Sequence, residues 1–172
     1  LYTFGSDHRW ASIGEGLRKQ LNFLSFAVFE EDFGPIKRRI EAEGIRLLDA
    51  PRGFDSNGVW FHDHNGVLIE VKVAEKTSPN DKMPFEMPSC PPGVAGAPQR
   101  SKAPKVRPLR LAHVLIFTAD VPKAISFYSR VLGLRLSDRS GGGICFMHGI
   151  HGSDHHLVAV AKSSAPRLHH CS

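Results

Sequence analysis

The amino-acid sequence predicts an α+β fold in which two βαβββ units follow one another along the chain. Three observations lead to this prediction. Eight of the twelve prolines lie between Pro79 and Pro108, which excludes a regular helix or an interior strand there and indicates a linker. Apolar runs and helix signals follow the same order on both sides of this linker. A short sequence repeat also relates the two sides.

The first unit begins with an apolar, aromatic-rich run at 23–29, which is typical of a buried strand. A helix is predicted next, because apolar residues recur at helical spacing between an expected N-cap, Asp32, and a stop at Gly44. Asn-Gly pairs then mark the turns between three further strands. These strands are predicted at 45–48, 59–62 and 67–73.

The second unit repeats this order. A strand is predicted at 113–117, and Asp120 is the expected N-cap of a helix with Pro122 in its first turn. Gly133 is expected to end this helix, because glycine tolerates the left-handed conformation common at helix ends. Further strands are predicted from Leu134, at 144–148 and at 157–161.

The tetrapeptide Gly-Ser-Asp-His occurs at 5–8 and again at 152–155, an offset of 147 residues. Because this repeat agrees with the matching order of elements, we interpret the chain as the middle of a longer, duplicated protein in which both modules are incomplete. Residues 1–75 are then the C-terminal part of a first, non-catalytic module, 76–108 a linker, and 109–172 the N-terminal part of a second, metal-binding module.

Composition excludes several classes of function. The net charge of +5 comes from scattered Lys and Arg residues that are not interleaved with aromatics, so we expect no nucleic-acid partner. No apolar run reaches the roughly 20 residues of a membrane span, so no membrane partner is expected either. The three cysteines are widely spaced without a CxxC pattern, which favours a reducing cytoplasm over a disulfide framework.

Histidine gives the clearest chemical signal, because six of the ten histidines lie between His148 and His170. His113 begins the first predicted strand of the second unit, and His170 begins a predicted strand of that module's other half. Two neutral imidazoles on facing strands are suitable ligands for a divalent metal ion. A 2-His-1-carboxylate site needs a third ligand, and the counterpart of Glu70 in the second copy is expected beyond Ser172.

The repeat assigns this metal to the second copy alone, because His170 aligns with Phe23 and His156 aligns with Arg9. Simpler interpretations remain open. A single strand histidine is more often a hydrogen-bonded core residue than a ligand, and the two histidine doublets could form a surface patch or a non-specific metal trap. The combination of both doublets with His113 favours the metal site.

Several motifs resemble a known family. The runs His113–Asp120, Ala124–Tyr128 and Val131–Leu134 resemble the opening of a module of the vicinal-oxygen-chelate superfamily, and Val59–Asp63 with Glu70 resembles a module ending. Within that superfamily, the closest resemblance is to two-domain type I extradiol ring-cleavage dioxygenases. It rests on Phe146-Met-His148, Asp154-His-His156 and Leu168-His-His170.

This resemblance implies the vicinal oxygen chelate fold and a non-haem Fe(II) site, with Mn(II) as the other possible metal. It implies that His113 and His170 are iron ligands, that His156 is the active-site acid/base, and that a glutamate ligand follows Ser172. The implied reaction is the extradiol (meta) cleavage of a catechol-type ring with O2, in aromatic compound degradation. The full-length protein is expected to be a cytoplasmic homo-oligomer.

Two other functions remain open from the sequence. One is a glyoxalase-like, metal-dependent isomerase or lyase, which uses a similar scaffold without oxygen. The other is a metal-free small-molecule binding protein of the antibiotic-sequestering kind. The paired histidines argue against the metal-free function, but they do not separate the two metal-dependent ones.

Overall fold

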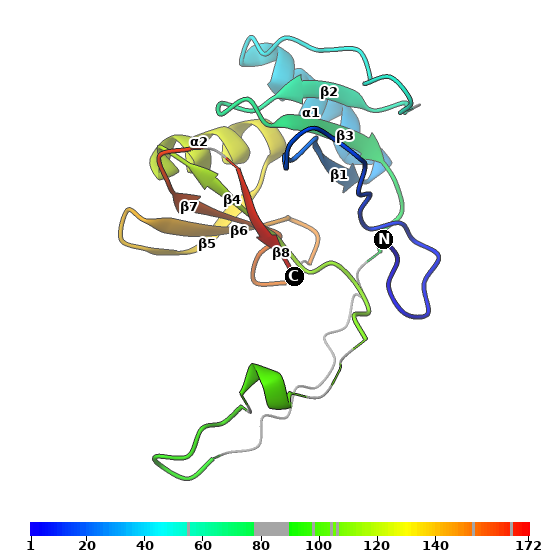
Figure 1. The fold of residues 1–172 in the computed structure, drawn as a ribbon. Helices are drawn as coiled ribbons and strands as arrows, with labels where there is room; N and C mark the ends of the chain where they lie inside the picture. The colour runs from blue at the N-terminus through cyan, green and yellow to red at the C-terminus, as the bar shows by residue number, and fades with distance from the viewer. Residues whose placement is uncertain are drawn as a thin grey trace.

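Two β-sheets, each packed on a helix, make up the folded part of the chain, and the two helices lie against each other (Figure 1). The structure, a computed structural model, describes residues 1–54, 56–77, 90–97, 99–103, 105, 107–152, 154–165 and 167–172. Ser153 of the repeat and much of the predicted linker, including 78–89, lie outside the described residues. Within the described ranges, no helix has the length and apolar character needed to cross a membrane.

The first sheet has the strand order β1-β3-β2. In this sheet β1 runs parallel to β3, and β2 pairs with β3 in the antiparallel direction. A helix, α1, connects β1 to the rest of the sheet, as the predicted order requires. The elements of this unit are β1 (Leu24–Val28), α1 (Glu30–Ala42), β2 (Val59–His62) and β3 (Leu68–Val73).

The prediction that Asp32 is the N-cap of α1 is wrong. The helix begins at Glu30, and its N-cap is Phe29, whose carbonyl accepts a hydrogen bond from the Asp32 amide at 3.1 Å. Three acidic residues therefore occupy the first helical turn. They stabilise this end through their charge near the positive end of the helix dipole, which removes the need for a side-chain cap.

The strand predicted at 45–48 is reduced to a single β-bridge between Leu48 and Trp60. The Leu48 amide donates to the Trp60 carbonyl at 2.8 Å, but the chain turns at Pro51 shortly afterwards. A proline has no amide hydrogen to continue a ladder, so the pairing stops after this contact.

The second sheet has the strand order β5-β6-β7-β4-β8. Here β4 runs parallel to β7 and antiparallel to β8. The predicted helix ends are confirmed: Asp120 accepts a hydrogen bond from the Lys123 amide at 2.9 Å, and Gly133 adopts φ +74°. The elements are β4 (Val114–Thr118), α2 (Val121–Leu132), β5 (Arg135–Ser140), β6 (Ile144–His148), β7 (Val158–Lys162) and β8 (Leu168–Cys171). A short 3-10 helix, η1 (Arg100–Lys102), precedes this unit.

One hydrophobic core joins the two units, because α1 and α2 pack against each other between the two sheets. Ile36 and Ile40 of α1 and Val131 of α2 are buried in this core, and the Arg39 guanidinium donates to the Val131 carbonyl at 3.2 Å. The predicted α+β class is confirmed. The division into residues 1–75, 76–108 and 109–172 stays a prediction, since the shared core crosses it.

A buried polar network also connects the units. The Tyr128 hydroxyl of α2 donates to Asp63 Oδ2 at 2.9 Å, and both side chains are buried. Asp63 Oδ1 accepts the backbone amides of Asn65 and Val67, each at 2.8 Å. Burial raises the pKa of Tyr128 well above its usual range, and the neighbouring Asp63 carboxylate raises it further. The phenol therefore stays protonated and remains the donor.

Replacing Tyr128 with Phe is expected to lower the free energy of unfolding of the full-length protein by about 1–3 kcal/mol, because a buried carboxylate oxygen loses its donor. Urea unfolding followed by tryptophan fluorescence measures the change. Tyr2→Phe is the matched control, since the Tyr2 side chain is 65% exposed and its hydroxyl reaches water. A Tyr128→Phe variant as stable as the control would show that this contact does not hold the units together.

Candidate metal centre

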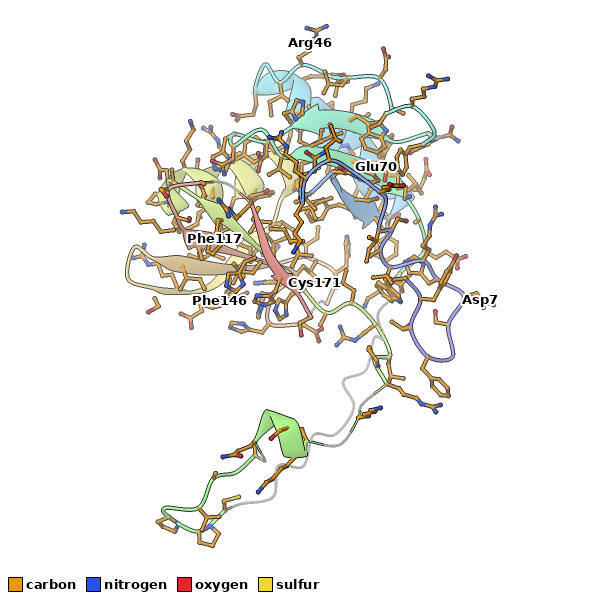
Figure 2. All side chains as sticks on the ribbon, viewed as in Figure 1. Asp7, Arg46, Glu70, Phe117, Phe146 and Cys171 are labelled. Atoms are coloured by element: carbon orange, nitrogen blue, oxygen red, sulfur yellow. The ribbon has the colours of Figure 1, made fainter. Side chains whose placement is uncertain are left out.

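The face of the second sheet that turns away from α2 carries the side chains of His113 and His170. In β4, Ile116 is fully buried in the core beside α2, so the alternate residues Leu115 and Phe117 project to the other face. His113 directly precedes β4 and continues this alternation. His170 lies opposite Leu115 in the pairing of β4 with β8 and shares its face. Figure 2 labels Phe117 on this sheet and Glu70 on the other.

Three imidazole rings meet at the end of this face where β4 begins. The Nε2 atoms of His113 and His170 are 3.2 Å apart. His156, in the loop before β7, has its ring centroid 4.4 Å from that of His113. The structure thus brings together all three residues singled out from the sequence, and their chemical roles stay predictions. One detail differs: His170 lies inside β8 rather than at its start, and β8 is the direct neighbour of β4 in the same sheet.

Burial and neighbouring rings favour the uncharged forms of His113 and His156. Burial lowers the pKa of His113, and the adjacent His170 lowers it further, while Asp154 acts in the opposite direction. The pKa of His156 is lowered first by burial and then by the neighbouring His113. These lowered pKa values favour the neutral forms of His113 and His156 at neutral pH, and the neutral imidazole is the form that binds metal ions.

The His156 ring is held by contacts from several sides. Phe146 of β6 packs against it with a centroid separation of 4.9 Å, and His155 Nδ1 lies 3.1 Å from His156 Nδ1. The same loop is tied to the segment before β4 by an ion pair between Arg110 and Asp154 at 2.5 Å. These contacts fix the loop at the start of β7 close to the start of β4.

The His113 and His170 pair fits a divalent metal ion. Two imidazole nitrogens that each lie about 2.0–2.1 Å from one ion are about 2.8–3.4 Å apart at octahedral or tetrahedral angles. The observed separation of 3.2 Å falls in this range. Among the residues that the structure describes, no group of three or more His, Cys, Asp or Glu side chains is arranged to hold a metal. A His113–His170 pair at this spacing would supply the two nitrogen donors of a facial triad.

In the first unit, the residue aligned with His170 is not a histidine. Phe23, which aligns with His170, packs its ring against Trp60 at a centroid distance of 4.9 Å. Glu70 is only 3% exposed, accepts a hydrogen bond from the Ser25 hydroxyl and lies 3.4 Å from the Lys72 ammonium group. These partners satisfy the Glu70 carboxylate within the first sheet.

Sequence reasoning did not single out the Arg110–Asp154 ion pair or the packing role of Phe146. The repeated Gly-Ser-Asp-His motif contained a signal for Asp154, because it placed this residue directly before the histidine doublet. It contained none for Arg110, which is 44 positions away along the chain. Only the parallel pairing of β4 with β7 brings the two residues together.

Comparison with known proteins shows similarity to one superfamily. Residues 110–170 match the sequence pattern of the Glyoxalase/Bleomycin resistance protein/Dioxygenase superfamily. Over 173 aligned residues the whole chain is 48% identical to Metapyrocatechase 2 of Cupriavidus necator and covers 54% of that protein. The resemblance stated from the sequence is confirmed.

Solved structures show the same fold at low sequence identity. The crystal structure of BphC, a halotolerant catechol dioxygenase, matches 91% of this chain and 51% of its own with a TM-score of 0.60 and 21% identity. The Mn(II)-bound glyoxalase from Novosphingobium aromaticivorans matches 86% of this chain and 44% of its own with a TM-score of 0.56 and 20% identity. The chain therefore spans about half the length of these relatives.

Proposed function

We propose that this chain, whose residues 110–170 form a module of the Glyoxalase/Bleomycin resistance protein/Dioxygenase superfamily, belongs to an extradiol dioxygenase. Its reaction is the meta cleavage of a catechol-type ring with O2 at a non-haem Fe(II) site. The observation that carries this proposal is the 3.2 Å approach of the His113 and His170 Nε2 atoms on one sheet face. The 48% identity to Metapyrocatechase 2 supports it.

In this proposal His113 and His170 hold the iron through their Nε2 atoms, and a carboxylate elsewhere in the full-length protein completes the site. The lowered pKa of His113 supports its part, because an uncharged ring needs no proton loss before it binds a cation. Bound iron supplies Lewis acidity toward the diol hydroxyls and electron transfer toward O2. Three protein ligands leave positions open for both reactants.

His156 acts as the proton carrier in this proposal. Its pKa is lowered, so the ring is uncharged at neutral pH and can accept a proton from a diol hydroxyl. Its Nδ1 contacts His155, which leaves Nε2 as the atom that takes the proton and later returns it. The ring bond beside the diol breaks, and both oxygen atoms of O2 enter the product, one in an aldehyde and one in a carboxylic acid.

The surface around the histidines suits an aromatic substrate. Leu115 and Phe117 share the face of His113, and Ala159 pairs with both Leu115 and Phe146 in the sheet register. This apolar lining would pack against the faces and edges of a ring, while the histidines form the polar end.

Oxygen uptake by the purified full-length protein, loaded anaerobically with Fe(II) and given catechol, tests this function. One O2 consumed per catechol, with formation of a semialdehyde product, is the expected result. A protein that binds metal but consumes no O2 with any catechol would instead be the glyoxalase-like isomerase. A protein that binds no metal would be the small-molecule binding protein, and either result would overturn the dioxygenase.

Metal identity and assembly are part of the same proposal. Fe(II) is the expected metal, and activity regained with Mn(II) in place of Fe(II) would reassign it. The full-length protein is expected to be a cytoplasmic homo-oligomer. Light scattering after size-exclusion chromatography measures its mass.

A further inference from the structure

We propose that His169 is a positioning residue that fixes the ring plane and the tautomer of His170. This inference rests on the proposed metal site, because it assigns to His169 a role that acts through the ligand His170. It starts from an irregularity in the pairing of β8 with β4. His170 pairs with Leu115, but the next residue of β4, Ile116, pairs with Leu168, so His169 is an extra residue in the strand.

This extra residue is a β-bulge, and it explains why two consecutive side chains serve the same face. In a regular strand, neighbouring side chains point to opposite faces, so His169 would point away from the site. A bulge locally breaks the alternation and re-aims a side chain, often beside an active site. The His169 and His170 rings accordingly lie 4.8 Å apart at an interplanar angle of 72°.

The two rings touch through specific atoms. His169 Nδ1 forms a short hydrogen bond of 2.6 Å with His170 Nδ1, in which one nitrogen donates and the other accepts. On its other side, the His169 ring packs edge-on against Phe117 of β4 with a centroid separation of 5.0 Å. His169 is therefore located by the bulge, by Phe117 and by His170, although one side of it faces solvent.

Metal binding decides the direction of this hydrogen bond. His170 Nε2 faces His113 Nε2, so Nε2 is the atom that offers its lone pair to the ion. A ring that binds an ion through Nε2 carries its proton on Nδ1, and His170 would donate this proton to His169 Nδ1. His169 carries its own proton on Nε2. Ligand histidines almost always donate a hydrogen bond from their second ring nitrogen to a carboxylate, a carbonyl or water. In this chain the acceptor would be the His169 imidazole.

The other doublet does not offer the same support to a ligand. His155 approaches His156 through the same pair of Nδ1 atoms, but at 3.1 Å and within a loop rather than a strand. His156 is also the proposed proton carrier rather than a ligand. The structure therefore assigns the ligand-positioning role to His169 and not to His155.

Two variants of the full-length protein separate positioning from general structure. His169→Phe keeps a ring against Phe117 but removes the acceptor, whereas His169→Asn keeps an acceptor oxygen close to the place of Nδ1. Co(II) is the probe, because its visible absorption reports both affinity and ligand geometry. His169→Phe is expected to weaken Co(II) binding by about 10-fold to 100-fold and to change the band shape. His169→Asn is expected to bind within about 3-fold of the unchanged protein.

Thermal unfolding of the metal-free variants completes the experiment. Equal midpoints for both variants and the unchanged protein are expected, because His169 acts on the ligand rather than on the core. Unaltered Co(II) binding by His169→Phe would overturn the positioning role without contradicting the metal site. Equal weakening by both variants together with lowered midpoints would also overturn it, as a structural effect. Absence of Co(II) binding by the unchanged protein would overturn the metal site itself, and with it this inference.

Discussion

Replacement of His170 by Ala is expected to remove both bound iron and ring cleavage from the full-length protein. The Nε2 atom of His170 lies 3.2 Å from that of His113 and is one of the two nitrogen donors in the proposed metal site. Loss of a ligand costs more than loss of a supporting contact, which alone weakens metal affinity by about 10-fold to 100-fold. We therefore expect affinity to fall by more than about 100-fold. Iron per chain, measured by a colorimetric chelator after dialysis, gives the result.

Cys171→Ser is the matched control for this variant. Cys171 is the next residue of β8, is exposed, and pairs through its backbone with Val114 at the edge of the sheet. Its replacement changes the same strand without touching the proposed ligands, so iron content and turnover should stay as they were. If His170→Ala kept its iron, the proposed centre would lie elsewhere in the protein.

Replacement of His156 by Phe is expected to slow turnover by about 100-fold to 10,000-fold, the usual contribution of a positioned acid or base. Iron content should stay near that of the unchanged protein, because His156 transfers protons and does not bind the metal in this mechanism. A phenyl ring also fills the space between Phe146 and His113, so the packing at 4.9 Å and 4.4 Å is largely kept. Steady-state oxygen uptake together with iron analysis measures both quantities.

His151→Phe provides the control for the loss of a histidine. His151 is exposed, pairs with Asp32 of α1 at 2.6 Å and packs edge-on against Phe29. Turnover should be unchanged in this variant. A His156→Phe protein that lost its iron would show that His156 is a ligand, whereas one with full activity would show that it carries no proton.

Local sequence signals were sufficient for most elements. In α2, the Asp120 side chain caps the first turn and Gly133 takes the left-handed conformation, so both ends depend on residues within a few positions. The start of α1 was mispredicted because three acidic residues compete for the N-terminal turn, and any of them is a plausible cap by type. The prediction of a full strand at 45–48 was wrong for another reason, because the length of the pairing depends on a distant partner and on the turn that follows.

The residues of the candidate site could also be predicted from the sequence. His113 and His170 could be placed at the ends of predicted strands, and the repeat connected His156 with the same copy. The hydrogen bond between Tyr128 and Asp63 could not be predicted from the sequence, because the two residues are 65 positions apart and no local pattern relates them. The Arg110–Asp154 ion pair could not be predicted for the same reason.

By itself, the sequence determined the α+β class, the order of the elements and the identity of the three clustered histidines, because these follow from short-range patterns and from an internal repeat. Only the tertiary structure decided how closely the rings approach, that His169 joins His170 on one face, and which contacts hold the two units together. The physical reason is that strand register, a one-residue bulge and contacts between distant segments are set by how the sheets pair and pack.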